Sequence, residues 1–404
     1  MATLTNLRHF YFGPDMIFPV GILGTLTNLR SIPFVHVSLT GTGIEELSAL
    51  SQLKDTLKIH NLEYVTDEGA RKANLGEKKH LRKLILRWDL QGPSSSSDSH
   101  KRVLEGLRPH SNLEYLEIQG FMGVNFPGWL SLLNNLKEIK LWGSNKCEGV
   151  PVFGHLRHLR VLGMYGLLNL KCMESEFYGY DEVAATSEEI KFLFPALKIL
   201  HIQDARNLTD WMEAPTGRVN IFPSLEELSL AHCDKLIYAP SHFPFLKKLV
   251  IKYMDRGSMP IASILSNQLT TLTSVVIRDV NGLTSLPDQM FKDNMSLAYL
   301  SIWNCIELAS IGPHGFGCGT SLQDLNISEC GNLRYFPDGL NPTSLRKLYI
   351  RNCPLLSSLP RGLENSTFLE TLELWGCSEI ISVPIPPHGL SSLKIEDCSQ
   401  SMIL

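Results

Sequence analysis

The stretch LQDLNISEC, from Leu322 to Cys330, decides the fold of this chain. Its apolar residues Leu322, Leu325 and Ile327 alternate with polar ones over a few positions. Successive side chains of a strand point to opposite faces. We therefore expect a short strand in which Leu325 and Ile327 point into a core and Asn326 points outward.

The same pattern, L-x-x-L-x-[LI]-x-x-C, occurs six times in the chain. From Leu225 onward the repeats begin at 225, 246, 272, 297, 322, 345, 369 and 390. These spacings fall within the roughly 20–29 residues of a leucine-rich repeat. Weaker copies begin at Leu81, Leu113, Leu136, Leu159 and Leu197, and degenerate ones lie near Leu7, Leu29 and Leu57. We predict about sixteen repeats.

The repeat predicts the architecture. One repeat cannot bury its apolar face alone, so neighbouring repeats stack and their strands pair in parallel. The second halves carry prolines, as in GLTSLPDQM at Gly282 and LLSSLPRGL at Leu355, which disfavour long helices. The predicted fold is an α/β repeat solenoid over a single domain, 1–404. It is a leucine-rich-repeat horseshoe with a parallel β-sheet on the concave face and mostly irregular or 3₁₀ convex segments.

Six cysteines occupy one repeat position, where the chain turns after the strand. A metal site would need close spacing such as C-x₂-C. These cysteines lie a whole repeat apart, and a small thiol tolerates full burial. We therefore predict a structural cysteine ladder of Cys233, Cys305, Cys330, Cys353, Cys377 and Cys398. Cys147, Cys172 and Cys318 fall outside it, and we expect Cys318 to be exposed.

Three stretches interrupt the repeat period. Residues 91–100, QGPSSSSDSH, predict a mobile surface loop, and 171–191 form an acidic insertion. Both are interpreted as solvated loops, with a regulatory role as the alternative. The stretch 60–80 predicts a short helix through Asp67–Asn74. The chain begins directly on a repeat with no polar capping unit, so we expect a further segment before it.

Composition narrows the class of protein. The 404 residues are 44% hydrophobic and 19% charged, with a formal net charge of −4. This balance indicates a folded protein and argues against nucleic-acid binding, which favours a strongly basic chain. Neither a secretory signal nor an apolar run long enough to span a membrane is evident. We predict a cytoplasmic location, with nucleo-cytoplasmic or peripheral plasma-membrane locations left open.

Catalytic and cofactor motifs are absent from the sequence. There is no phosphate loop G-x-x-x-x-G-K-[ST], no H-E-x-x-H and no G-x-S-x-G. His155 and His158 stand three positions apart, but the repeat pattern puts them in a turn before a strand. We predict that the chain is not an enzyme and holds no cofactor or metal.

The concave face offers the strongest functional candidate. The residue after each strand's second core position should face outward, and several of these residues are Trp, Tyr or Arg, which are enriched in binding hot spots. The alternative is that the rings only cover neighbouring strands. The predicted partner-binding residues are Trp142, Tyr165, Lys252, Arg278, Tyr299, Trp303, Tyr349, Arg351 and Trp375.

Several irregular pieces carry a family resemblance. The stretches Leu57–Asp89, Val103–Leu130 and SEFYG at Ser175–Gly179 occur in this order beside the L-x-S-L-P spacers. Together they resemble the leucine-rich-repeat domain of plant coiled-coil, nucleotide-binding disease-resistance proteins. The family's coiled-coil and nucleotide-binding domains are not found in this sequence, so nucleotide binding is not carried over to it.

The resemblance implies a recognition domain. Such a domain would bind a pathogen effector or a guarded host protein and restrain the nucleotide-binding domain of the parent receptor through its first repeats, 1–60. One alternative is a free-standing adaptor or decoy. Another is an extracellular receptor ectodomain, which predicts a signal peptide, capping cysteines and an L-x-G-x-I-P repeat, none of which the sequence has.

Overall fold

A computed structural model describes the chain. It covers residues 4, 6–13, 16, 18–41, 43–89, 96–179, 191–213, 219–266, 269–292, 294–311, 321–336, 344–384 and 389–399. Cys318, residues 91–95 and most of the acidic insertion lie outside this range. The residues form two compact units, Met1–Arg206 with Thr216–Phe222, and Asn207–Pro215 with Pro223–Leu404. The single domain predicted for 1–404 stays a prediction.

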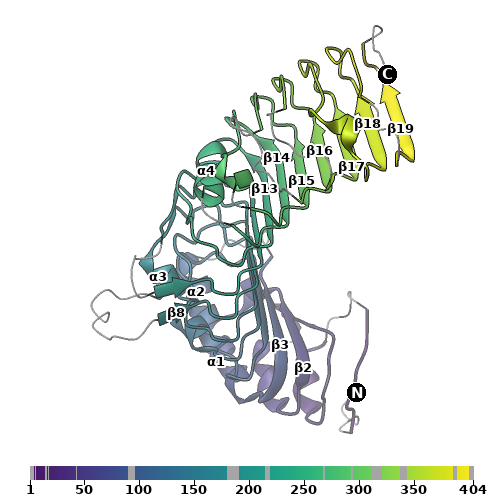
Figure 1. Ribbon diagram of the computed structural model, residues 1–404. Helices are drawn as coiled ribbons and strands as arrows, with labels where there is room; N and C mark the ends of the chain where they lie inside the picture. Colours follow the sequence, from purple (N-terminus) through teal and green to yellow (C-terminus); the bar gives the residue numbers. More distant parts are fainter. Residues whose placement is uncertain are drawn as a thin grey trace. The chain divides into compact units, whose positions relative to one another are not determined.

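The first unit is built on a parallel sheet whose strands follow one another in chain order (Figure 1). Its strands are β1 (Val35–His36), β2 (Lys54–His60), β3 (His80–Arg87), β4 (Tyr115–Gln119), β5 (Glu138–Trp142), β6 (Val161–Tyr165) and β9 (Ile199–Gln203). The register shifts once, at Asp55 in β2. A separate pair, β8 (Lys191–Leu193) with β11 (Val219–Ile221), is also parallel.

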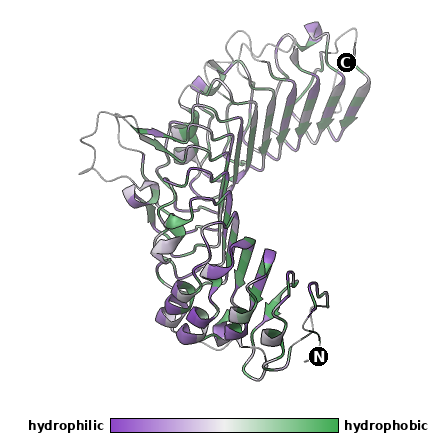
Figure 2. Ribbon diagram, turned by 90° about the horizontal axis from the view of Figure 1, so that it is seen from below, coloured by the Kyte–Doolittle hydropathy of each residue, from purple (hydrophilic) through white to green (hydrophobic). Residues whose placement is uncertain are grey.

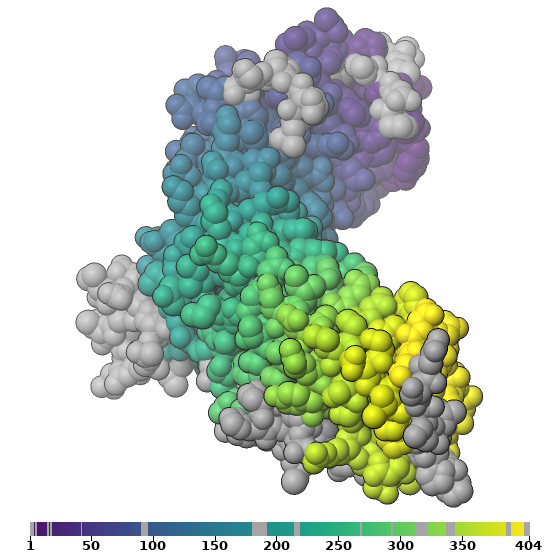
Figure 3. Space-filling model, turned by 90° about the horizontal axis from the view of Figure 1, so that it is seen from above, coloured from purple at the N-terminus to yellow at the C-terminus, as the bar shows by residue number. Residues whose placement is uncertain are grey.

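The second unit repeats this arrangement without a register shift. Its strands are β12 (Glu227–Ala231), β13 (Lys248–Met254), β14 (Ser274–Val280), β15 (Tyr299–Trp303), β16 (Asp324–Ser328), β17 (Lys347–Arg351), β18 (Thr371–Trp375) and β19 (Ser392–Glu396). Figure 3 shows the repeats of this unit packed side by side in sequence order, from green to yellow.

The predicted alternation is confirmed. Leu325 and Ile327 have no exposed surface, whereas Asn326 between them is half-buried. Leu325 pairs with Leu300 and Leu348 of the adjacent strands, so the core is a continuous apolar row. Figure 2 colours this alternation of apolar and polar residues along the strands. The leucine-rich-repeat sheet predicted from the sequence is therefore present.

Most of the second halves are short turns and 3₁₀ segments, as predicted. The 3₁₀ segments are η1 (Leu23–Thr25), η2 (Ile44–Ala49), η3 (Leu62–Tyr64), η4 (Leu75–Glu77), η5 (Gly128–Leu132) and η8 (Leu363–Asn365). The α-helices are α1 (Asp67–Lys72), α2 (Ser97–Gly106), α3 (Ser175–Tyr178), α4 (Ser258–Leu265) and α5 (Gln289–Lys292). Two further short strands are β7 (Cys172–Met173) and β10 (Asp210–Trp211).

One predicted loop is partly wrong. The helix α1 confirms the expected helix at 67–74, ending two residues early, but residues 97–100 of the predicted loop 91–100 begin α2. The Ser96 hydroxyl accepts a hydrogen bond from the Ser99 amide, which caps the helix. Val103 and Leu104 are buried at helical spacing. The run of four serines looked like a loop, although one of them caps an amphipathic helix that starts within the run.

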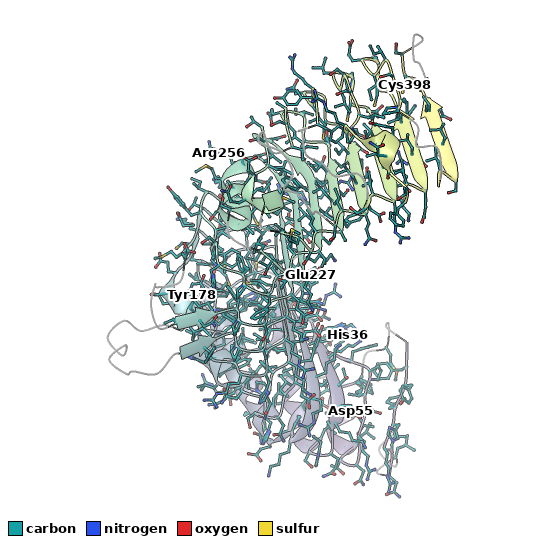
Figure 4. All side chains as sticks on the ribbon, in the orientation of Figure 1. His36, Asp55, Tyr178, Glu227, Arg256 and Cys398 are labelled. Carbon is teal, nitrogen blue, oxygen red and sulfur yellow. The ribbon has the colours of Figure 1, made fainter. Side chains whose placement is uncertain are left out.

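The SEFYG stretch packs as an aromatic anchor. Phe177 and Tyr178 of α3 are buried, and the Phe177 ring centroid lies 5.0 Å from that of Phe194 (Figure 4 labels Tyr178). Gly179 follows with φ of +73°, a left-handed conformation that favours glycine at a helix end. The SEFYG segment, on which the family resemblance partly rests, thus contributes aromatic side chains to the core of the first unit.

Five of the six cysteines assigned to the ladder lie in the core. Cys233, Cys305, Cys330, Cys353 and Cys377 are fully buried, and all are free thiols. The Cys305 Sγ donates to the Trp303 carbonyl oxygen at 3.6 Å, two residues back, and the other members repeat this contact. Cys398 is only half-buried, contrary to prediction, because no described repeat packs beyond β19 (Figure 4).

The accessible thiols should react first. Burial raises the pKa of Cys305 to about 11 and that of Cys377 to about 12, so their reactive thiolates are scarce. We expect iodoacetamide at pH 8 to alkylate the half-buried Cys172 and Cys398 well before these two. Peptide mass spectrometry measures the order, with guanidinium-unfolded protein as the control in which all react. Equal rates for Cys305 and Cys398 would contradict the ladder.

A buried lysine gives the first unit a pH-dependent stability. Lys78 is 1% exposed, and its Nζ donates to the Leu47 and Leu50 carbonyl oxygens at 2.6 and 3.2 Å. Burial lowers the pKa of Lys78 to about 8 from the ordinary 10.5. Between these values the unfolded chain binds a proton that the folded chain does not, so stability rises with pH.

Lys78→Met isolates this effect. We expect the free energy of unfolding of the natural protein, minus that of the variant, to increase from pH 8 to pH 10. The slope has an upper bound of about 1.4 kcal/mol per pH unit. Urea unfolding at several pH values measures it. A difference that stays flat or falls with pH contradicts the lowered pKa.

Candidate functional site

Residues at or near the ends of the strands form an aligned outward row in each unit. Strand register places each next to its counterpart in the adjacent strand. The row of the first unit is His36, His60, Arg87, Gln119, Trp142, Tyr165 and Gln203. The row of the second unit is Ala231, Lys252, Arg278, Trp303, Ser328, Arg351, Trp375 and Glu396.

None of the nine predicted partner-binding residues is buried. Trp142 and Tyr165 belong to the first unit and the other seven to the second. Tyr299 begins β15 and Tyr349 lies at the centre of β17, so these two flank the row of the second unit. Their outward placement agrees with the sequence analysis, and their role in binding stays a prediction.

The first unit's row contains a stacked aromatic pair. The Trp142 and Tyr165 rings lie 3.8 Å apart at 13°, and the Tyr165 hydroxyl is 3.1 Å from His201 Nδ1. Burial raises the pKa of Tyr165, so its hydroxyl stays protonated. The rings do cover neighbouring strands, as the alternative predicts, yet Trp142 is still 39% exposed.

Sequence reasoning missed the start of the first unit's row. His36 and His60 meet edge to face with ring centroids 4.9 Å apart, and Arg87 comes directly after Leu86, the register partner of Ile59. Burial, then the charges of His36, Arg87 and Lys58, lower the pKa of His60 to about 4. Figure 4 labels His36 at the row and Asp55 at the opposite end of the strands. The sequence signal that could have identified these residues is the pair of strand motifs LKIH, which ends at His60, and LILR, which ends at Arg87.

In the second unit, aromatic rings and a guanidinium stack on one another along the row and directly beside it. The His232 and Tyr253 rings stack at 4.6 Å and 8°. The Arg278 guanidinium carbon lies 5.6 Å from the Tyr253 ring centroid and 3.4 Å from that of Trp303. Asp279 holds the Arg278 Nε at 2.9 Å. Four adjacent strands therefore present one pre-organised surface of π faces.

The remaining chemistry is sparse. Among the described residues, no cluster of three or more His, Cys, Asp or Glu could hold a metal. No helix in the described part of the chain is both long enough and apolar enough to cross a membrane. His155 and His158 lie in turns before β6, as predicted, and His155 Nε2 is 2.7 Å from the Gly179 carbonyl oxygen.

One cavity lies in the first unit. It has a volume of about 850 Å³ and is lined by Asn134, His155, Arg157, Phe192 and Pro195. No two of these lining residues combine a nucleophile with a general base.

The chain is similar to known proteins over most of its length. The R13L1/DRL21 leucine-rich-repeat family matches residues 44–167. Disease resistance protein RGA1 of Solanum bulbocastanum is 34% identical over 286 residues, which cover 69% of this chain and 27% of that protein. The RPP13-like disease resistance protein 1 of Arabidopsis thaliana is 28% identical over 353 residues, covering 82% and 30%. The leucine-rich-repeat domain of a type III effector aligns over 81% of this chain and 82% of that one, with 18% identity and a TM-score of 0.31.

The fold and the family match define a leucine-rich-repeat protein. More particularly, the chain belongs to the leucine-rich-repeat region of plant disease-resistance proteins of the nucleotide-binding class. This confirms the resemblance drawn from 57–89 and 103–130. The chain spans about a quarter of the length of the Solanum relative.

A pair of substitutions separates binding rings from structural ones. We expect Trp142→Ala to lower the free energy of unfolding by about 0.5–1.5 kcal/mol, the worth of one aromatic pair. Leu141→Ala, its buried neighbour, should cost about 2–5 kcal/mol. Urea unfolding measures both. If the two losses are equal, the Trp142 ring is a structural cover and the row loses its support as a binding surface.

Proposed function

We propose that the chain is the recognition domain of a plant immune receptor, acting inside the cell on a pathogen effector or a guarded host protein. The observation that carries the proposal is the row of the second unit, where Arg278 is already stacked on Trp303. Exposed Trp, Tyr and Arg held in one geometry lose little conformational entropy when a protein partner binds. The relatives' names place them in disease resistance.

The second half of the proposal is restraint of a nucleotide-binding domain by the first repeats. The start of the first unit's row supports it, because the cations Lys58 and Arg87 lie close enough to His60 to act on it as like charges. An acidic protein surface complements such a cluster. Ligand binding elsewhere on the repeats would change this contact by favouring one of two states.

The rival function is a free-standing adaptor or decoy. It uses the same outward rows but contacts no nucleotide-binding domain. Its distinguishing property is therefore binding of a recognised protein with no affinity for that domain.

Charge reversal tests the restraint. We expect the chain to co-precipitate with a nucleotide-binding domain of the family, and Lys58→Glu with Arg87→Glu to weaken this by roughly tenfold or more, because two close charge pairs are lost. The matched control is Lys235→Glu with Arg334→Glu, which makes the same charge change at exposed turns of the second unit. It should bind normally.

Two outcomes overturn the proposal in different places. If the Lys58/Arg87 variant binds the nucleotide-binding domain as well as the natural chain does, the first repeats are not the site of the restraint. No binding by the natural chain, when circular dichroism shows it folded, favours the adaptor instead.

A further inference from the structure

A hollow in the second unit lies between two tryptophans of the row. Strand register places Trp303, Ser328, Arg351 and Trp375 on four consecutive strands. Because neighbouring strands are about 4.8 Å apart, the two indoles stand roughly 14 Å apart with smaller side chains between them. The hollow has a volume of about 290 Å³. Its other lining residues are Ser301, Asn326, Glu329 and Asn352.

The charges around the hollow are unequal. Its single cation, Arg351, is held by Glu373, with Nη2 2.6 Å from Oε2. Glu329 lines the hollow, and its carboxylate has no ion-pair partner among the described residues. Asp397 accepts the indole N–H of Trp375 at 2.6 Å. Glu373 neutralises Arg351, so the Glu329 carboxylate leaves the lining of the hollow with a net negative charge.

The indole walls suit a flat cation. The Arg278 guanidinium stacks on Trp303 at 3.4 Å in this same row, which shows that the strand geometry permits such contacts. Arginine makes them more often than lysine, because its planar, weakly hydrated group stacks on rings. The volume lies just below the roughly 300–1,000 Å³ of small-molecule sites, so one side chain fits better than a whole ligand.

We propose that this hollow binds an arginine side chain presented by the recognised protein, with the guanidinium stacked on one of the two indoles, Trp303 or Trp375, and attracted by the Glu329 carboxylate. This inference adds a binding chemistry to the proposed function. It rests on that function only in assuming that the arginine belongs to the recognised protein. An anionic group is disfavoured because the one cation available is already neutralised by Glu373.

Model peptides of one sequence test the chemistry. The probes are acetyl-Gly-Ser-X-Ser-Gly-amide with X as arginine, lysine, norleucine or glutamate. The 404-residue chain is labelled with ¹⁵N-tryptophan, and the indole N–H signals of its six tryptophans are assigned by Trp→Phe variants. Trp142, in the first unit, is the internal control.

We expect the arginine peptide to shift the Trp303 and Trp375 signals and leave Trp142 unchanged. Norleucine should bind roughly 3- to 30-fold more weakly, which corresponds to one cation–π contact. Glu329→Gln should weaken arginine binding roughly 2- to 5-fold, the worth of an exposed ion pair. Glu364→Gln, the same change at an exposed position in η8, should have no effect.

Specific results overturn the inference. These are norleucine or glutamate binding as well as arginine, equal shifts at Trp142, or equal effects of Glu329→Gln and Glu364→Gln. The outcome is separable from the proposed function. If the chain binds the arginine peptide but does not capture the nucleotide-binding domain, the hollow is a binding site of an adaptor. If the chain captures that domain but does not bind the arginine peptide, only the inference about the hollow is wrong.

Discussion

Parallel pairing in one register is the constraint on which the other features depend. Leu325 sits between Leu300 and Leu348, and all three are fully buried. A slip of one residue would turn every apolar side chain outward and every polar one inward, so the register is fixed by burial alone. The outward residues are thereby aligned without any interaction of their own. That leaves Trp303 and its neighbours free to carry chemistry that folding does not require.

The backbone conformation at the ends of the strands explains why the rows of outward residues lie along one edge of each sheet. The residue that follows each of β15, β16 and β17 is left-handed, with φ of 51° at Asn304, 56° at Glu329 and 50° at Asn352. Asn and Asp adopt this conformation at low cost, whereas Glu does so less readily. The next residue turns inward as the buried thiol of the ladder. The chain therefore leaves the sheet abruptly, and Glu329 is placed beside the row with its carboxylate available.

The periodicity of the sequence was sufficient to predict the repeated strands, but not the segments that depart from the repeat. The spacing of Leu322, Leu325 and Ile327 predicted the sheet, its direction and which residues face outward. It could not predict the α2 helix, because Ser96 looks like one more loop serine until its cap is seen. It also missed His36 and His60, whose degenerate repeats have no cysteine to mark the register. Contacts between repeats, such as Arg351 with Glu373, join residues 22 positions apart, and no local pattern encodes them.

The two rows differ in how they hold their cations, and this decides what each can select. In the second unit Arg278 is bound to Asp279 and Arg351 to Glu373, so each guanidinium offers a fixed plane but little net charge. Selection there must come from shape, stacking and the unpaired carboxylate. In the first unit burial, and then crowding by His36, Arg87 and Lys58, disfavours protonation of His60. An approaching carboxylate relieves the crowding, so selection there follows charge. One repeated strand thus supports two kinds of recognition, because only the outward positions differ between the repeats.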